Sequence, residues 1–195
     1  MNELAFIRAQ VATERRHMAA IRSALTAALA PIPDTTAASV RDSFFQVCAD
    51  YLVYSVGRLI AQDQAHCDQL RPRVPRSDAS AHGALEALQA RLEQSRAAIG
   101  ELSQALNARR SGSLDAAGLA AAAERYVAFY QAVLAPQRHR LSHLLDAHYR
   151  IEDWRSASWV DADSLLEERR RYAACIAQRP PGIDIPEAGD SDSDK

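Results

Sequence analysis

The chain has little of what β-sheets, disulfide frameworks and strongly charged binding surfaces require. Glycine supplies only 7 of the 195 residues, aromatic residues make up 6%, and β-branched runs are few, which argues against a sheet protein. Three cysteines with no CxxC pair argue against a disulfide framework or a structural zinc site, and they favour a reducing cytoplasm. A formal net charge of -2 leaves no strong basic field, so we expect no nucleic-acid partner.

Long hydrophobic runs are also missing. No stretch of about 18 apolar residues occurs, so we expect no membrane partner. The sequence contains no GxSxG, P-loop or GxGxxG motif, and no feature of it indicates an enzyme. The residues that are abundant, alanine, leucine and arginine above all, are strong helix formers. Together with a hydrophobic content of 48%, this composition predicts an all-α protein with a buried core.

Four long segments show apolar residues at three- and four-residue steps, which is the period of an amphipathic helix. Prolines or a glycine lie in the connections between them and end the segments. Because the connections are short, we expect an up-down-up-down four-helix bundle. Pro136 falls inside the fourth segment and predicts a kink there. The expected helices cover residues 3–29, 39–70, 81–109 and 114–149.

The end of the chain changes character twice. Residues 161–177 (DADSLLEERRRYAACIA) predict a short fifth helix that is capped by Asp161 or Asp163. Residues 179–195 are rich in proline and then acidic, which is typical of a disordered tail. We therefore expect one helical domain over residues 1–178, followed by that tail.

Polar residues interrupt the apolar stripes of the first two predicted helices. Glu14 and His17 lie three residues apart, as do Asp63 and His66, so each pair shares one helix face. In antiparallel neighbouring helices these pairs would converge in one layer of the core, close to Gln62. Carboxylates and imidazoles that converge inside a bundle are suitable ligands for iron or manganese. The candidate metal ligands are therefore His17, His66, Glu14 and Asp63.

The fourth predicted helix and its exit provide a family resemblance. The stretch FYQAVLAPQRHRLSHLLDAHYRIEDW, from Phe129 to Trp154, resembles the bacterial hemerythrin-like (HHE cation-binding) domain. Members of that family often have an aromatic pair, a ligand helix and a leucine-rich segment that ends in Asp-Trp before a short final helix. The stretches ERRHMAAIRSAL and QDQAHCDQLRP are similar to the family's first and second ligand helices. The resemblance covers about residues 4–178 and implies a four-helix bundle around a non-haem di-iron centre.

The matching ligand positions show substitutions when the family pattern is carried over residue by residue. The helix-one histidine is present, but an amide and a histidine replace the His-x-x-x-Glu pair of helix two. A serine, with Glu93 two residues away, replaces the histidine of helix three, and valine and glutamine replace the pair of helix four. The resemblance therefore implies an altered site in place of the ordinary di-iron centre. The residues at these positions are His17, Gln62, His66, Ser95, Val133 and Gln137.

Two interpretations of the polar layer stay open, and a third ranks below them. In the first, a hemerythrin-like bundle binds one non-haem iron or another divalent metal for sensing or storage, with His17 and His66 as anchors. In the second, the bundle is a metal-free interaction or regulatory module with an unidentified protein partner, and its polar residues form a hydrogen-bonded core layer. The third is a ferritin-type di-iron oxidase, and it ranks last because the two x-x-His pairs fall on helices one and two, which is a poor match to the pairing that such a site requires.

Overall fold

The computed structural model describes residues 2–30, 38–137, 142–158 and 160–187. These ranges contain seven α-helices and no strand, which confirms the predicted all-α class. A five-residue π-helix, η1 (Tyr130–Leu134), and a 3-10 turn, η2 (Ala135–Gln137), follow α4. The α-helices are α1 (Glu3–Leu29), α2 (Ala38–Leu70), α3 (Ala79–Arg110), α4 (Ala116–Phe129), α5 (Ser142–His148), α6 (Ile151–Ser158) and α7 (Ala162–Ala177).

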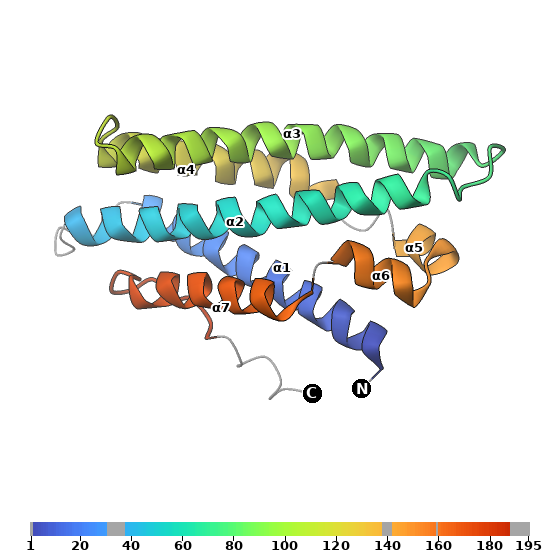
Figure 1. Ribbon diagram of the computed structural model, residues 1–195. Coiled ribbons are helices and arrows are strands. Elements are labelled where there is room, and N and C mark those ends of the chain that lie inside the picture. The colour runs from blue at the N-terminus through green and yellow to red at the C-terminus, as the bar shows by residue number, and fades with distance from the viewer. Residues whose placement is uncertain (1, 31–37, 138–141, 159, 188–195) are drawn as a thin grey trace.

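The three longest helices are α1 to α3, and they pack together. Each runs antiparallel to the one before it in the chain (Figure 1). Helix α4 runs back along α3 and also contacts α1 and α2. Helices α6 and α7 pack against α1 and α2 on the side away from α3 (Figure 1). As a result, α1 and α2 have neighbours on both sides, and polar residues in their stripes meet partners from two different layers.

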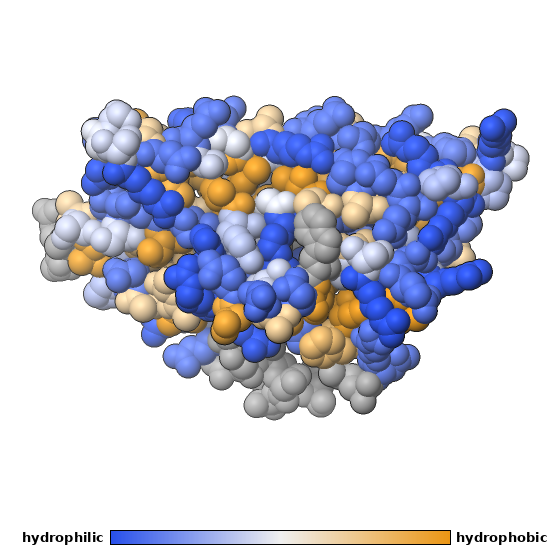
Figure 2. Space-filling view, viewed as in Figure 1, coloured by the Kyte–Doolittle hydropathy of each residue, from blue (hydrophilic) through white to orange (hydrophobic). Residues whose placement is uncertain are grey.

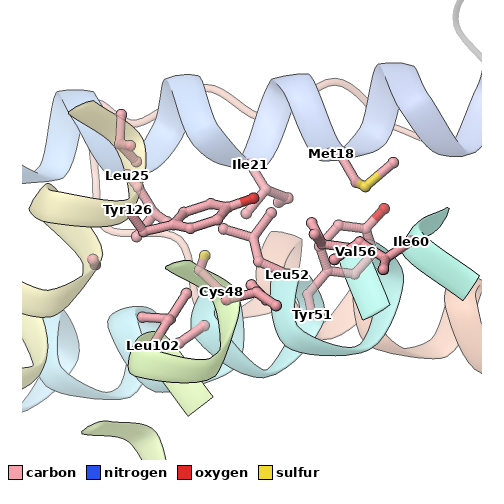
Figure 3. Close-up of a cluster of buried hydrophobic side chains, with 14 of the residues drawn as sticks. Met18, Ile21, Leu25, Cys48, Tyr51, Leu52, Val56, Ile60, Leu102 and Tyr126 are labelled. Atoms are coloured by element: carbon pink, nitrogen blue, oxygen red, sulfur yellow. The ribbon is translucent and has the colours of Figure 1, made fainter. Parts of the chain in front are cut away.

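The core follows the predicted apolar stripes closely along α2 and α3. Leucines and isoleucines at three- and four-residue steps on α3 are buried because this face packs against α2 and α4. Figure 3 shows one part of this core, where side chains of α1, α2, α3 and α4 meet. The residues at these three- and four-residue steps along α3 are all buried: Leu85, Leu88, Leu92, Ser95, Ile99, Leu102 and Leu106.

The prediction of one continuous fourth helix over residues 114–149 is wrong. The α-helix ends at Phe129 and continues as η1 and then as η2, which contains Pro136. Proline has no N–H to donate to the carbonyl four residues before it, and its ring clashes with that carbonyl. The backbone accommodates both effects by widening into a π-helix and then tightening into a 3-10 turn. Pro136 therefore interrupts the helix where the sequence suggests only a kink.

Between α5 and α7 the chain forms a helix, α6 (Ile151–Ser158), that the periodicity did not predict. Helix α6 is short, and Trp154 is its buried anchor. Asp153 holds the start of α6 in place. Its carboxylate accepts a hydrogen bond from the backbone N–H of Arg150 and forms a bidentate ion pair with Arg73, at 2.5 and 2.6 Å. The predicted cap of α7 is confirmed at Asp161, whose carboxylate accepts the N–H of Ser164 at 2.8 Å.

The first half of the expected tail packs on the helices. Ile183 and Ile185 are buried in the hydrophobic core, at 7% and 1% exposure. The Tyr172 hydroxyl donates to the carbonyl of Pro186 at 2.6 Å, which ties this segment to α7. The composition misled the prediction because two isoleucines are enough to anchor a short proline-rich stretch. Residues 188–195 lie outside the described part of the chain.

The surface visible in Figure 2 is mostly hydrophilic, with apolar patches scattered among charged side chains. Within the described ranges, no helix has the length and apolar character needed to cross a bilayer.

Candidate functional site

The first polar group lies where α1, α2 and α7 meet, and we call it the Glu168 cluster: His17, Tyr51, Glu168 and Tyr172. The Glu168 side chain is 4% exposed, and its Oε1 atom lies 2.9 Å from His17 Nδ1. The Tyr51 hydroxyl donates to the same oxygen at 2.8 Å. The His17 ring stacks on Tyr172 with centroids 3.9 Å apart and planes 10° from parallel. His17 therefore has a hydrogen-bond partner in Glu168 and a stacking partner in Tyr172.

Glu14 lies beside this cluster and has a cation of its own. Its carboxylate is 3.1 Å from the guanidinium of Arg58, which also donates to the Ser164 carbonyl. Burial raises the pKa of Glu14, and the charge of Arg58 opposes that rise. Burial also raises the pKa of Tyr51, and the negative charge of Glu168 adds to the effect. The tyrosine therefore stays protonated and acts as a donor.

Glu168 is not among the predicted core residues, because it stands in a charged run, EERRR. The signal was present in its spacing. Glu168, Tyr172 and Cys175 are the buried residues of α7, at steps of four and three. A carboxylate at a core-facing position of such a stripe needs a donor, and His17 and Tyr51 supply donors.

The second polar group lies further along α2, toward α6. His66 is 4% exposed, and its Nδ1 atom is 2.9 Å from the Tyr149 hydroxyl. The His66 and Trp154 rings pack in a T-shaped arrangement, with centroids 5.5 Å apart and planes at 65°. Burial lowers the pKa of His66 to about 4, and the nearby charge of Arg15 adds to the shift. His66 is therefore neutral at pH 7.

Asp63 and Gln62 complete this group. Asp63 lies between two guanidiniums, 3.3 Å from Arg91 and 3.9 Å from Arg15. Burial raises its pKa, and the two arginines oppose the rise. The Gln62 amide donates to the Ser158 carbonyl at 3.1 Å, which links α2 to the end of α6.

The candidate metal ligands thus have hydrogen-bond or ion-pair partners in two groups. His17 shares a carboxylate with Tyr51, and Asp63 is paired with arginines. A guanidinium beside a carboxylate repels a dication from the same oxygens. This arrangement does not fit a di-iron centre, which requires carboxylates free to bridge two ions. Among the described side chains, no group of three or more histidine, cysteine or acidic residues is placed to hold a metal.

The remaining positions implied by the resemblance differ in placement. Ser95 is buried, and its hydroxyl donates to the Arg91 carbonyl at 2.8 Å. Glu93 is exposed and accepts a hydrogen bond from Gln89 at 3.4 Å. Val133 is half-buried in η1, and the side chain of Gln137 lies outside the described set.

A cavity of about 660 Å³ runs between α1, α2, α3 and the α4–η1 segment. Gln62, Asp63, His66 and Ser95 all line it, so three positions that the resemblance assigns to ligands open onto this space. The positive charge of the cavity wall is not predicted by the apolar stripes of the sequence. The described lining contains five arginines, Arg8, Arg15, Arg16, Arg22 and Arg91, against two aspartates, Asp63 and Asp146.

One end of the cavity contains buried polar atoms without partners. Arg22 is 8% exposed, and its Nε atom has no hydrogen-bond partner among the described residues. The Tyr126 hydroxyl oxygen likewise has no partner there within hydrogen-bonding geometry, although Arg22 is close enough for its charge to oppose the rise that burial causes in the pKa of Tyr126. The Arg22 guanidinium stacks over the Tyr130 ring, 3.6 Å from its centroid. We call Arg22, Tyr126 and Tyr130 the Arg22 end of the cavity.

No protein-family model, curated protein or solved structure matches this chain. The similarity to hemerythrin-like domains therefore rests on the sequence features described above.

Proposed function

We propose that α1 to α4 form an up-down-up-down bundle of the hemerythrin-like type, and that this bundle is a metal-free binding or regulatory module. The pairing of Asp63 with Arg15 and Arg91 is the observation that supports this most directly. In this proposal the guanidiniums neutralise the carboxylate that a metal would otherwise neutralise. The module binds a ligand in its core and performs no catalysis.

The position of the cavity supports the same proposal. Ser95 and Gln62 open onto it at positions where the family has metal ligands, and the lining is rich in arginine. Positive charge around a cavity disfavours a dication and favours an anion. In this proposal, the positions that lack a metal ligand and the basic cavity belong to the same part of the core.

The competing candidate is a mononuclear metal site anchored by His66. A neutral imidazole is the form that binds metals, and burial lowers the pKa of His66 to about 4, which keeps it neutral. Asp63 lies one helical turn away on the same cavity wall. The two proposals differ in whether the purified protein contains metal in a fixed ratio.

Metal analysis of the purified protein separates them. We expect well under one ion per chain after incubation with ferrous iron, manganese or zinc under anaerobic conditions followed by desalting. The melting temperature should not change with a chelator, because no metal contributes to folding. One ion per chain that is lost in His66→Ala and retained in His143→Ala, an exposed control on α5, would overturn the proposal.

A further inference from the structure

We infer that the cavity binds an amphipathic carboxylate, a linear apolar chain whose carboxylate group is held by Arg22 and Tyr126. The inference rests on the proposed function, because a metal in the core would occupy the same space. The charge of the lining, the unpartnered polar atoms and the dimensions of the cavity each support it.

The charge pattern selects an anion at one end. Asp146 is paired with Arg8, and Asp63 is paired with Arg15 and Arg91. None of the ion pairs found among the described residues includes Arg22. A buried guanidinium without a carboxylate is costly, so an anion that reaches it is bound strongly.

The unpartnered atoms define what that anion must be. The Nε–H of Arg22 and the hydroxyl of Tyr126 are both donors without an acceptor among the described residues. A carboxylate has two acceptor oxygens and can accept from both groups at once. Figure 3 shows the Tyr126 ring between α1 and the side chains of α2 and α3, with its hydroxyl oxygen directed toward Ile21. The stacking of Arg22 on Tyr130 holds the guanidinium in one plane.

The length of the cavity selects a chain as the rest of the ligand. Its lining on α1 extends from Arg8 to Arg22, a span of roughly 20 Å at the helical rise per residue. Its volume of about 660 Å³ lies within the usual range of small-molecule sites. The side chains along it are mostly apolar, including Val56, Leu59, Leu88, Leu92 and Leu134. An extended alkyl chain would bury its apolar surface against these residues.

The π-helix that precedes Pro136 also borders the cavity. Tyr130 begins η1 and Leu134 ends it, and both line the cavity. Single-turn π-helices are costly, and they occur frequently at functional sites. Here η1 follows α4 along the cavity. It connects the Arg22 end of the cavity, through Tyr130, with the part that apolar side chains line, through Leu134.

Calorimetric titration with sodium decanoate, well below its micelle concentration, tests the inference. We expect saturable binding of one decanoate per chain, at least about tenfold tighter than 1-decanol, which has the same chain and no charge. Acetate, which has the charge and no chain, should show no measurable binding. Trp154 lines the cavity, so its fluorescence provides a second readout.

Two variants and a matched control locate the carboxylate. Arg22→Met should remove the preference for decanoate over decanol, and Tyr126→Phe should reduce it about three- to tenfold. Arg125→Met on the exposed face of α4 should leave both affinities unchanged. If Arg22→Met fails to fold, as judged by circular dichroism, Arg22→Lys and Tyr126→Phe still test the position of the anion.

Equal affinity of the native protein for decanoate and decanol would overturn the inference, as would an absence of binding. An equal loss in Arg125→Met and Arg22→Met would also overturn it. These results leave the metal-free proposal standing if metal analysis finds no bound ion. Stoichiometric metal in the purified protein would instead refute the proposed function itself.

Discussion

The Glu168 cluster and the Arg22 end of the cavity are both buried polar regions against α1, but they differ in how completely their groups are paired. In the cluster, one carboxylate oxygen accepts from Tyr51 and contacts His17. At the Arg22 end, a guanidinium nitrogen and a phenol oxygen have no partner among the described residues. Complete pairing is typical of structural polar networks, whereas unpaired buried donors need an explanation, such as a ligand. The two regions should therefore respond in opposite ways to the same kind of substitution.

The largest expected effect concerns the segment that covers the Glu168 cluster. A chain that ends at Gln178 lacks the buried Ile183 and Ile185 and the hydrogen bond to Tyr172. We expect it to lose about 4 kcal/mol of unfolding free energy, because two isoleucine side chains leave the core. Urea denaturation measures this loss. A chain that ends at Glu187 keeps both isoleucines and is the control; equal stability of the two shortened chains would show that the segment contributes nothing.

The next effect is the pH dependence caused by His66, which lies in the second polar group, on the wall of the cavity. Burial lowers its folded pKa to about 4, whereas the unfolded value is near 6.5. Between these values the unfolded chain binds the proton and the folded chain does not, so stability is present above pH 6.5 and is lost as the pH falls to 4. The shift corresponds to a loss of about 3 kcal/mol.

A comparison with His66→Gln isolates this contribution. Tyr149, Trp154, Arg15 and Asp63 surround the imidazole, and Asp63, with its raised pKa, has a pH dependence of opposite sign. Denaturation at several pH values between 7 and 4 should therefore show a steeper loss in the native protein than in the variant. Parallel curves for the two proteins would contradict the lowered pKa.

The smallest effect gives the sharpest contrast, because the same atom is removed from both regions. Tyr51→Phe should lose about 2 kcal/mol, since its hydroxyl donates to the Glu168 carboxylate. Tyr126→Phe should leave the free energy of unfolding unchanged or raise it by up to about 1 kcal/mol, because its hydroxyl has no partner. Thermal and urea denaturation of the two variants provide the comparison. A loss in Tyr126→Phe as large as that in Tyr51→Phe would show that the two regions are equally paired.

Much of the long-helix architecture follows from the sequence alone. The predicted first helix has the same bounds as α1, and the buried face of α3 is the predicted stripe. This works because a three- and four-residue period places apolar side chains on one face whatever the neighbours are. The prediction fails at Pro136 and at residues 179–187, where a missing donor and two buried isoleucines outweigh the pattern.

The candidate site was predictable only in part. The burial of His17, Asp63 and His66 agrees with their positions in the stripes, but their partners come from elements far away in the sequence. Glu168 on α7 and Tyr149 after α5 could not be assigned to them by spacing within one helix. Whether these residues bind a metal stays a prediction for the metal analysis described above.

The sequence by itself determined the helical class, the cap of α7 and the buried faces of the long helices, since these depend on local hydrogen bonding and on the period of apolar residues. Only the tertiary structure decided which polar groups are paired and which face a cavity. Arg22 illustrates the reason: its position next to Ile21 on α1 says nothing of Tyr126 and Tyr130 on the α4–η1 segment, which bury it. The pairing of a buried charge depends on contacts between elements, and these exist only after the helices have packed.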